Sequence, residues 1–433
     1  MSPHDAAEAL IHFPDTSSLP PPPQMVTYAQ FREQLQQNKS MDDMAKRTAN
    51  QALRKESVKA IVELQLWWLN RMLNTPAPLQ EKMTLLLHGH FTTAAIEKGV
   101  EGDLVLQQNR LFRQYALGNL HDLTLAVSKD PAMLLYLDNA ANNKSHPNEN
   151  YARELMELFT LGLGNYTEED VRQSARALTG WTIDRQTGAF MVNARTHDDG
   201  VKTFLTRNGN FDGSDIVDII YQQRACERFW SQTLLSAFVY NDPEPELIDE
   251  FANVIARNRF ELAPSMSALL QSNVFYSERA YRALVKSPVE FVVGAHKQLG
   301  LTEIVAGTPQ ALRTMGQVLF YPPNVAGWPG GANWLTSQML IARENYIARM
   351  VNGRAMDDSS WVTQVPMDAN NASREIIFTL LQNDAPSQAS DQLVAYLNGA
   401  GTSALGMLSA ENYDERVRGA VYLAMAMPAY QLG

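Results

Sequence analysis

The sequence predicts a mainly α-helical protein, a large multi-helix globular array with a small irregular or β-hairpin insertion around residues 181–212. Apolar residues recur at helical spacing almost throughout the chain from Tyr28 onward. Only residues 181–212 alternate apolar and polar residues and are rich in turn formers, which indicates two or three short strands. With 433 residues, 45% of them hydrophobic, the chain is long enough to bury a large core.

The N-terminal region predicts the division into domains. The segment from Ser17 to Pro23 ends in four consecutive prolines, which is typical of a stiff polyproline-like linker. We therefore expect an N-terminal segment with its linker at 1–23, a main helical domain at 24–350, and a C-terminal helical extension at 351–433 that packs on this domain.

The helices follow in order. A long amphipathic helix is expected over residues 41–74, and the prolines at positions 76 and 78 end it. Further helices are expected at 79–91, 103–118, 119–128, 131–138, 215–223, 227–239, 244–257, 262–271, 287–299 and 308–319, with several more after residue 335. The long helix repeats large apolar residues at helical spacing, which indicates core packing, at Leu64, Trp67, Trp68 and Met72.

Residues 146–181 predict a helical hairpin that carries an unusual density of charge. Pro147 is placed to open a helix over residues 148–161, which the following glycines end. Thr167 is placed to cap a second helix over residues 168–179, with Asp170 at the third position of a near capping box. Carboxylates of the first helix should therefore meet guanidinium groups of the second.

One interpretation of this charge is structural. Glu157 lies among apolar residues, and a buried carboxylate must be paired or neutralised. We then expect Arg153, Arg172 or Arg176 to contact Glu157 directly and to hold the two helices in register.

The other interpretation is functional. One of Glu149, Glu154 and Glu157 would be a metal ligand or a general acid or base, with its pKa shifted by burial and by the neighbouring arginines. The residues in this stretch are compatible with both interpretations.

The stretch HPNENYARELMELFTLGLGNYTEEDVRQSARALTGW resembles the central signature of the bacterial family called domain of unknown function 1800. Four further stretches are similar to the family in the same order, at residues 78–93, 196–205, 285–294 and 315–335. The resemblance implies a mostly helical bacterial protein. It also implies a partner encoded beside the chain, an exported protein of the family called domain of unknown function 1501, which resembles sulfatases and alkaline phosphatases.

Two histidine clusters are candidates for chemistry. His88 and His90 flank Gly89 near the end of a predicted helix, where they would form a metal pair or simply cap the helix. His197 and Asp198 lie in the irregular insertion with Asp199 and Lys202 nearby, and a histidine with carboxylates is one way to hold a divalent metal. An Asp-Asp-Gly turn also needs no ligand to explain it.

The loop YPPNVAGWPGGANW, residues 321–334, is a candidate binding surface. Trp328 and Trp334 would stack on a sugar or another flat ligand, with Asn324 and Asn333 hydrogen bonding to it. The alternative is a rigid plug that closes the helical array and buries both tryptophans.

Charge and targeting signals limit the class of protein. A formal net charge of −11 disfavours binding to nucleic acid or anionic lipid, which both require basic patches. No stretch approaches the roughly 18 apolar residues of a membrane span. The N-terminus lacks the basic and apolar regions of a signal peptide, so the sequence predicts a cytoplasmic protein, with co-export to the periplasm beside its partner as the alternative.

Two functions remain. We favour a helical interaction or accessory protein that acts with the co-encoded partner. The alternative is a hydrolase in which a divalent metal activates water against a polar substrate, saccharide or phosphorylated. In that case His88, Glu154 and His197 should converge. The residues assigned to the hydrolase are Glu154, Glu149 and His197 for catalysis, His88, His90 and Asp198 for the metal, and Asn324, Trp328, Asn333, Trp334 and Arg176 for the substrate.

Overall fold

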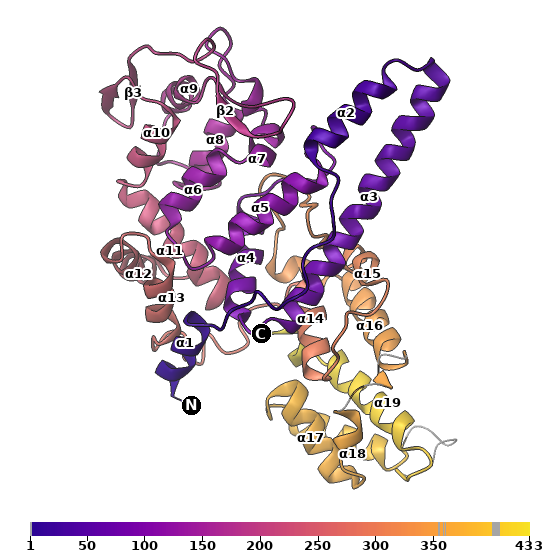
Figure 1. Cartoon of the computed structure of the whole chain (residues 1–433). Coiled ribbons are helices and arrows are strands. Elements are labelled where there is room, and N and C mark those ends of the chain that lie inside the picture. The colour runs from indigo at the N-terminus through magenta and orange to yellow at the C-terminus, as the bar shows by residue number, and fades with distance from the viewer. Residues whose placement is uncertain (1, 354–355, 358, 360, 401–407) are drawn as a thin grey trace. The chain divides into compact units, whose positions relative to one another are not determined.

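The fold is mainly α-helical, as the sequence predicts (Figure 1). The computed structural model describes residues 2–353, 356–357, 359, 361–400 and 408–433. The chain forms two compact units, made of residues 1–67, 75–277 and 319–328 in the first and of residues 68–74, 278–318 and 329–433 in the second. Within the described residues, no helix is long and apolar enough to cross a membrane.

The first unit contains thirteen of the described α-helices. Residues 68–74, at the end of the third of them, belong to the second unit. Their bounds are α1 (Pro3–Ile11), α2 (Tyr28–Asn38), α3 (Asp43–Asn74), α4 (Pro78–His90), α5 (Gly102–Gln114), α6 (Leu120–Ser128), α7 (Pro131–Tyr136), α8 (Asn150–Glu157), α9 (Glu168–Ala177), α10 (Gly213–Ile220), α11 (Arg224–Phe238), α12 (Pro245–Arg257) and α13 (Leu262–Leu270), with the 3₁₀ turn η1 (Asn139–Ala141).

The insertion around residues 181–212 forms two separate antiparallel hairpins in this unit. Strand β1 (Trp181–Ile183) pairs with β2 (Phe190–Val192), and β3 (Lys202–Phe204) pairs with β4 (Arg207–Gly209). Strand β3 packs beside α9, so the insertion lies against the charged helical hairpin.

The second unit is also helical. Its elements are α14 (Pro288–Gln298), α15 (Thr308–Thr314), η2 (Gly331–Leu335), α16 (Ser337–Val351), η4 (Val362–Gln364), α17 (Ala369–Leu381), α18 (Ser387–Leu397), α19 (Tyr413–Ala426) and η5 (Pro428–Gln431). Helix α19 packs against α16, α17 and α18, and so forms the centre of this group.

Local signals explain several boundaries. The Thr167 hydroxyl and the Asp170 carboxylate form the predicted capping box at the start of α9. Helix α8 ends at Glu157, four residues earlier than predicted, because the hydrogen bonds that follow span five and six residues instead of four. The amides of Leu161 and Gly162 both donate to the Met156 carbonyl, and Gly162 adopts a φ of 77° that favours glycine.

The long helix α3 buries most of the apolar residues predicted for the core. Leu64 and Trp68 are fully buried and Met72 is 6% exposed. Trp67 is only half-buried. Its indole Nε1 donates to the carbonyl of Pro20 at 2.9 Å. The proline-rich segment is therefore held against the helix by this hydrogen bond.

Candidate functional site

The α8–α9 hairpin is held by arginine–carboxylate pairs. Arg153 on α8 donates to both carboxylate oxygens of Glu168 on α9, at 2.7 and 2.8 Å, and more weakly to Glu149 at 3.3 Å. Arg172 pairs with Glu169 one turn away on its own helix at 2.6 Å. The expected pairing of α8 carboxylates with α9 guanidinium groups is wrong: the charges meet across the hairpin in the opposite sense, with the arginine on α8 and the carboxylate, Glu168, on α9.

The expected arginine contact to Glu157 is wrong. Glu157 is half-buried, and its Oε2 accepts a hydrogen bond from the Tyr166 hydroxyl at 2.9 Å. The arginines that were expected there pair with other carboxylates. Because α8 ends at Glu157, this side chain lies beside the turn between the helices, where Tyr166 reaches it.

Glu154, a predicted catalytic residue, is half-buried on the same helix. Burial and the charge of Glu157 raise the pKa of its carboxyl, and Arg153 offsets part of this shift. In the described part of the chain its side chain has no hydrogen-bond partner. Glu149, the other predicted catalytic acid on this hairpin, pairs with Arg153.

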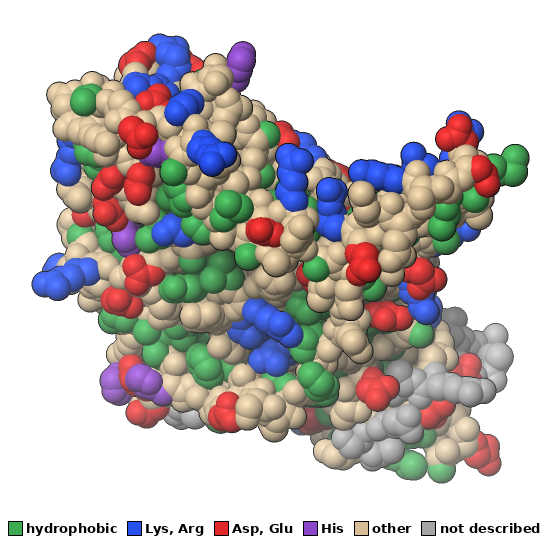
Figure 2. All heavy atoms as spheres, turned by 45° about the horizontal axis from the view of Figure 1, so that its top comes forward, with side chains coloured by type: hydrophobic (Ala, Val, Ile, Leu, Met, Phe, Trp, Pro, Cys, Tyr) green, Lys and Arg blue, Asp and Glu red, His purple; other side chains and the backbone are tan. Residues whose placement is uncertain are grey.

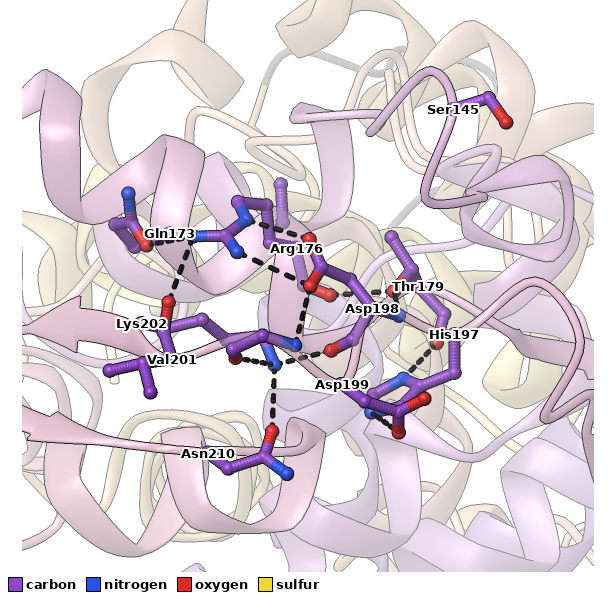
Figure 3. Close-up of polar contacts among 12 residues, drawn as sticks. Ser145, Gln173, Arg176, Thr179, His197, Asp198, Asp199, Val201, Lys202 and Asn210 are labelled. Carbon is purple, nitrogen blue, oxygen red and sulfur yellow. Dashed lines mark hydrogen bonds and ion pairs between the residues drawn. The ribbon is translucent and has the colours of Figure 1, made fainter.

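Arg176 and Asp198 form the densest polar group of the insertion (Figure 3). Arg176 on α9 donates through Nε and Nη2 to the two carboxylate oxygens of Asp198, at 2.8 and 3.2 Å, and through Nη1 to Gln173 at 2.7 Å. Its hydrogen bonds to Asp198 lower the pKa of that carboxyl. Both oxygens of this predicted metal ligand are therefore engaged.

Lys202 completes this group from strand β3 (Figure 3). It is 1% exposed, and its ammonium donates to the Gly200 carbonyl at 3.0 Å and to the Asp198 carbonyl. Burial lowers the pKa of the lysine, whereas the nearby Asp198 charge opposes the shift. The loop at residues 198–201 thus wraps around a buried ammonium, which satisfies its carbonyls.

His197, the predicted catalytic histidine, is 14% exposed at its side chain. Its Nδ1 donates to the Thr179 carbonyl at 2.7 Å, and its Nε2 lies 4.0 Å from an Asp199 oxygen. A Cβ on Gly180 would come within 3.1 Å of the His197 Cβ, and Gly180 has a φ of 79°. Glycine at this position permits the close approach of the two segments.

His88 and His90 are both held inside the helical body. The Nε2 of His88 accepts the amide N–H of Phe320 at 3.0 Å, and His90 Nε2 donates to the Phe159 carbonyl at 3.0 Å. Burial lowers the pKa of His88 to about 3 and that of His90 to about 4. The two rings are therefore neutral at physiological pH.

The first part of the loop at residues 321–334, up to Trp328, packs against the end of α4. A Cβ on Gly327 would lie 2.3 Å from the Gly89 carbonyl oxygen, so backbone meets backbone at this point. Trp328 is half-buried and its ring lies 5.5 Å from that of His88. The exposed Asn324 accepts the amide N–H of Ala326 and so closes its own turn.

The rest of the loop belongs to the second unit. Asn333 is exposed, and its amide donates to the Gly330 carbonyl at 3.1 Å. Trp334 is half-buried, and its Nε1 is buried without a hydrogen-bond partner among the described residues. Each part of the loop thus forms its own local turns.

The structure does not bring the predicted site residues together. Neither Glu154 nor His197 forms a hydrogen bond, ion pair or ring contact with His88 in the described part of the chain. Across residues 2–353, 356–357, 359, 361–400 and 408–433, no group of three or more His, Cys, Asp or Glu side chains lies where it could hold a metal ion. Among the described residues, two pairs of the predicted set are in direct contact: Arg176 with Asp198 through an ion pair, and His88 with Trp328 through their rings.

A surface pocket of about 520 Å³, whose lining includes His121, Asp218 and Arg259, is not among the sites predicted from the sequence. The two ring nitrogens of His121 lie 3.0 Å from Asp122 and 2.6 Å from Asp218. Each ring nitrogen therefore lies within hydrogen-bonding distance of a carboxylate oxygen. The adjacent His121 and Asp122 are the one signal of this group in the sequence.

Comparison with known proteins identifies the chain's relatives at the level of a family. The family model described as Protein of unknown function (DUF1800) matches residues 6–432. The comparisons with curated proteins and with solved structures gave no match.

Proposed function

The chain belongs to the family described as Protein of unknown function (DUF1800), and we propose that it is a helical interaction protein, the accessory of a separate partner. The proposed partner is an exported protein of the family called domain of unknown function 1501, encoded beside this chain. The chain would stay in the cytoplasm unless it is exported to the periplasm, folded, together with this partner.

The observation that carries the proposal is the engagement of the polar residues in the family stretches. His88 binds the backbone of Phe320, and Arg176 with Lys202 holds the loop at residues 198–201. The His88 and Arg176 contacts join helices to other segments of the chain, 232 and 22 residues away, and Lys202 fixes the loop that precedes its own strand. Residues used in this way build a rigid framework, and a rigid framework supports recognition at its surface.

A metal-dependent hydrolase would need lone pairs that these contacts occupy. The His88 Nε2 lone pair accepts the Phe320 amide, and both Asp198 oxygens accept the Arg176 guanidinium. A metal at His88 would first have to displace its hydrogen bond, which stabilises the folded chain, and a metal at Asp198 would have to compete with the positive charge of the Arg176 guanidinium. The geometry therefore favours the accessory function over the hydrolase.

Co-purification tests the proposal. The untagged chain and its tagged co-encoded partner are mixed at roughly 10 µM each, which populates any complex with a Kd below about 1 µM. We expect the two proteins to elute together from a size-exclusion column. Separate elution at this concentration would overturn the proposal. Fractionation of cells with and without the partner's export signal then tests whether the chain reaches the periplasm with it.

A further inference from the structure

The most exposed helical segment of the first unit is the hairpin of α2 and the first half of α3, residues 28–60, here called the arm (Figure 1). Among its side chains only Tyr28 and Asn38 are buried, and the first buried residue that follows on α3 is Ile61. The Asn38 amide donates to Asn50 at 2.9 Å and so links the two helices. Helices draw most of their stability from packing, so this much exposed helix is unusual.

The arm is basic in an acidic protein. Residues 28–60 contain seven lysines and arginines and four acids, a net charge of +3, which leaves −14 for the rest of the chain. Figure 2 shows Lys and Arg side chains along the arm, which lies at the right of the view. Of the seven basic side chains, Lys59 pairs with Glu63 at 3.9 Å. Within the described residues, the other six form no ion pair or side-chain hydrogen bond.

One exposed face of α3 combines this charge with apolar side chains. Met44 is 79% exposed and Val58 is 46% exposed, and they are fourteen residues apart, so they lie on one side of the helix. The exposed Arg47, Arg54 and Lys55 lie on the same side. We call the surface of Met44, Arg47, Gln51, Arg54, Lys55 and Val58 the basic face; it is about 21 Å long.

We propose that the basic face is a docking surface for a partner protein with an acidic patch. Complementary charge steers such an encounter and selects the partner, and the exposed Met44 and Val58 supply apolar contacts at the two ends of the face. The inference rests on the proposed function, because it names the surface and the partner chemistry that the accessory protein would use.

The alternatives fit the face less well. Asp42 and Asp43 lie exposed beside Met44 at the end of the arm, where an anionic membrane would repel them. The face has no aromatic side chain to stack on nucleic-acid bases, and the charge of −14 elsewhere opposes a polyanion. An acidic protein patch of limited size matches both the charge and the apolar residues.

The test reverses charge on the face and measures binding of the co-encoded partner by calorimetry. The variant is Arg47→Glu with Arg54→Glu and Lys55→Glu. The matched control is Arg185→Glu with Arg195→Glu and Arg207→Glu, three exposed arginines of the same unit with no side-chain partner among the described residues. We expect the variant to weaken binding at least tenfold and the control to stay within threefold, and we expect the wild-type affinity to fall as salt rises from about 50 to 300 mM.

Each result has one meaning. A complex that forms equally well with the variant overturns the docking surface and leaves the accessory function standing. The absence of any complex with wild-type protein overturns both. Light scattering of the chain alone tests for a second copy: a dimer that the variant dissolves would assign the face to self-association and overturn the acidic partner. Unchanged circular dichroism and Tm show that the variants are folded.

Discussion

Two charged helical hairpins of the same unit, α8–α9 and the arm, differ in whether their arginines are paired with carboxylates. In α8–α9 each of Arg153, Arg172 and Arg176 has a carboxylate partner within 2.8 Å. On the arm, Arg47 and Arg54 have no side-chain partner among the residues that the structure describes. The arginines of the first hairpin are thus all paired with carboxylates, whereas Arg47 and Arg54 of the second are not.

The difference arises from what each hairpin packs against. Helix α9 lies beside strand β3 and its preceding loop, which brings Asp198 to Arg176. Within the described residues the arm's acids form no ion pair with its basic face; Asp42, for example, caps α3 by accepting the amides of Met44 and Ala45. Substitutions in the paired framework should therefore change stability, and substitutions on the arm should change binding.

The largest expected effect in the framework is that of His88→Ala. The fully buried ring would leave a cavity, and the amide of Phe320, a residue held at a φ of 64°, would lose its acceptor. We expect a loss of about 3 to 4 kcal/mol in the free energy of unfolding, measured by urea denaturation. His146→Ala, at an exposed position of the family signature, is the control and should change it by less than about 0.5 kcal/mol. Similar losses in both variants would contradict the framework role of His88.

The next effect is that of Arg176→Ala. The guanidinium is 28% exposed and holds Asp198, Gln173 and the loop at 198–201, so we expect a loss of about 2 kcal/mol. A double-mutant cycle with Asp198→Ala should give a coupling energy of about 1 to 2 kcal/mol. Arg172→Ala, in a half-exposed pair on the same helix, should lose clearly less, because solvent screens that pair. A coupling energy near zero would show that the Arg176–Asp198 pair adds no stability.

The sequence predicts much of this framework and misses its partners. The capping box at Thr167 and Asp170 is local, so residues 167–170 alone suffice to predict it. The choice of Tyr166 as the partner of Glu157 depends on where α8 ends, and the pairing of Arg176 with Asp198 depends on the packing of the insertion. Such contacts between segments distant in sequence are not encoded in spacing along one helix.

The histidines show the same limit. The pattern of His88, Gly89 and His90 predicts a metal pair or a helix cap. In the structure, the His88 ring accepts a hydrogen bond from the backbone of Phe320, 232 residues away. A metal and a backbone amide both use a histidine lone pair, and the sequence contains no feature that separates them. The exposed charge of the arm is also invisible in the sequence, because an amphipathic pattern does not state whether its outer face is covered.

A smaller effect concerns pH at the base of the arm, where Ser57 donates to Glu101 and the Tyr28 amide donates to Asp103. Burial and the Asp103 charge raise the pKa of Glu101 from 4.5 to about 7. Between these values the folded chain keeps a proton that the unfolded chain releases. This contribution to stability is present below about pH 4.5 and is lost as pH rises to 7.

Replacement of Glu101 by Gln removes this titration. Relative to wild type, Glu101→Gln should gain about 2 kcal/mol in the free energy of unfolding between pH 5 and pH 8. Urea denaturation at both pH values measures the difference. Glu56→Gln, at an exposed acid of the arm, serves as the control and should show no such pH dependence. A constant difference between wild type and Glu101→Gln across this range would show that the carboxyl titrates at its ordinary pKa.

The smallest expected effect on stability belongs to the arm itself. Arg54→Ala removes an exposed charge that has no side-chain partner within the described residues, so the free energy of unfolding should change by less than about 0.5 kcal/mol. Arg153→Ala is the comparison, because its side chain holds Glu168 across α8 and α9, and its loss should be measurably larger. Urea denaturation of the two variants decides the point. An equal loss in both would mean that Arg54 stabilises the fold through contacts of its own, and the contrast between the paired and the unpaired arginines of the two hairpins would fail.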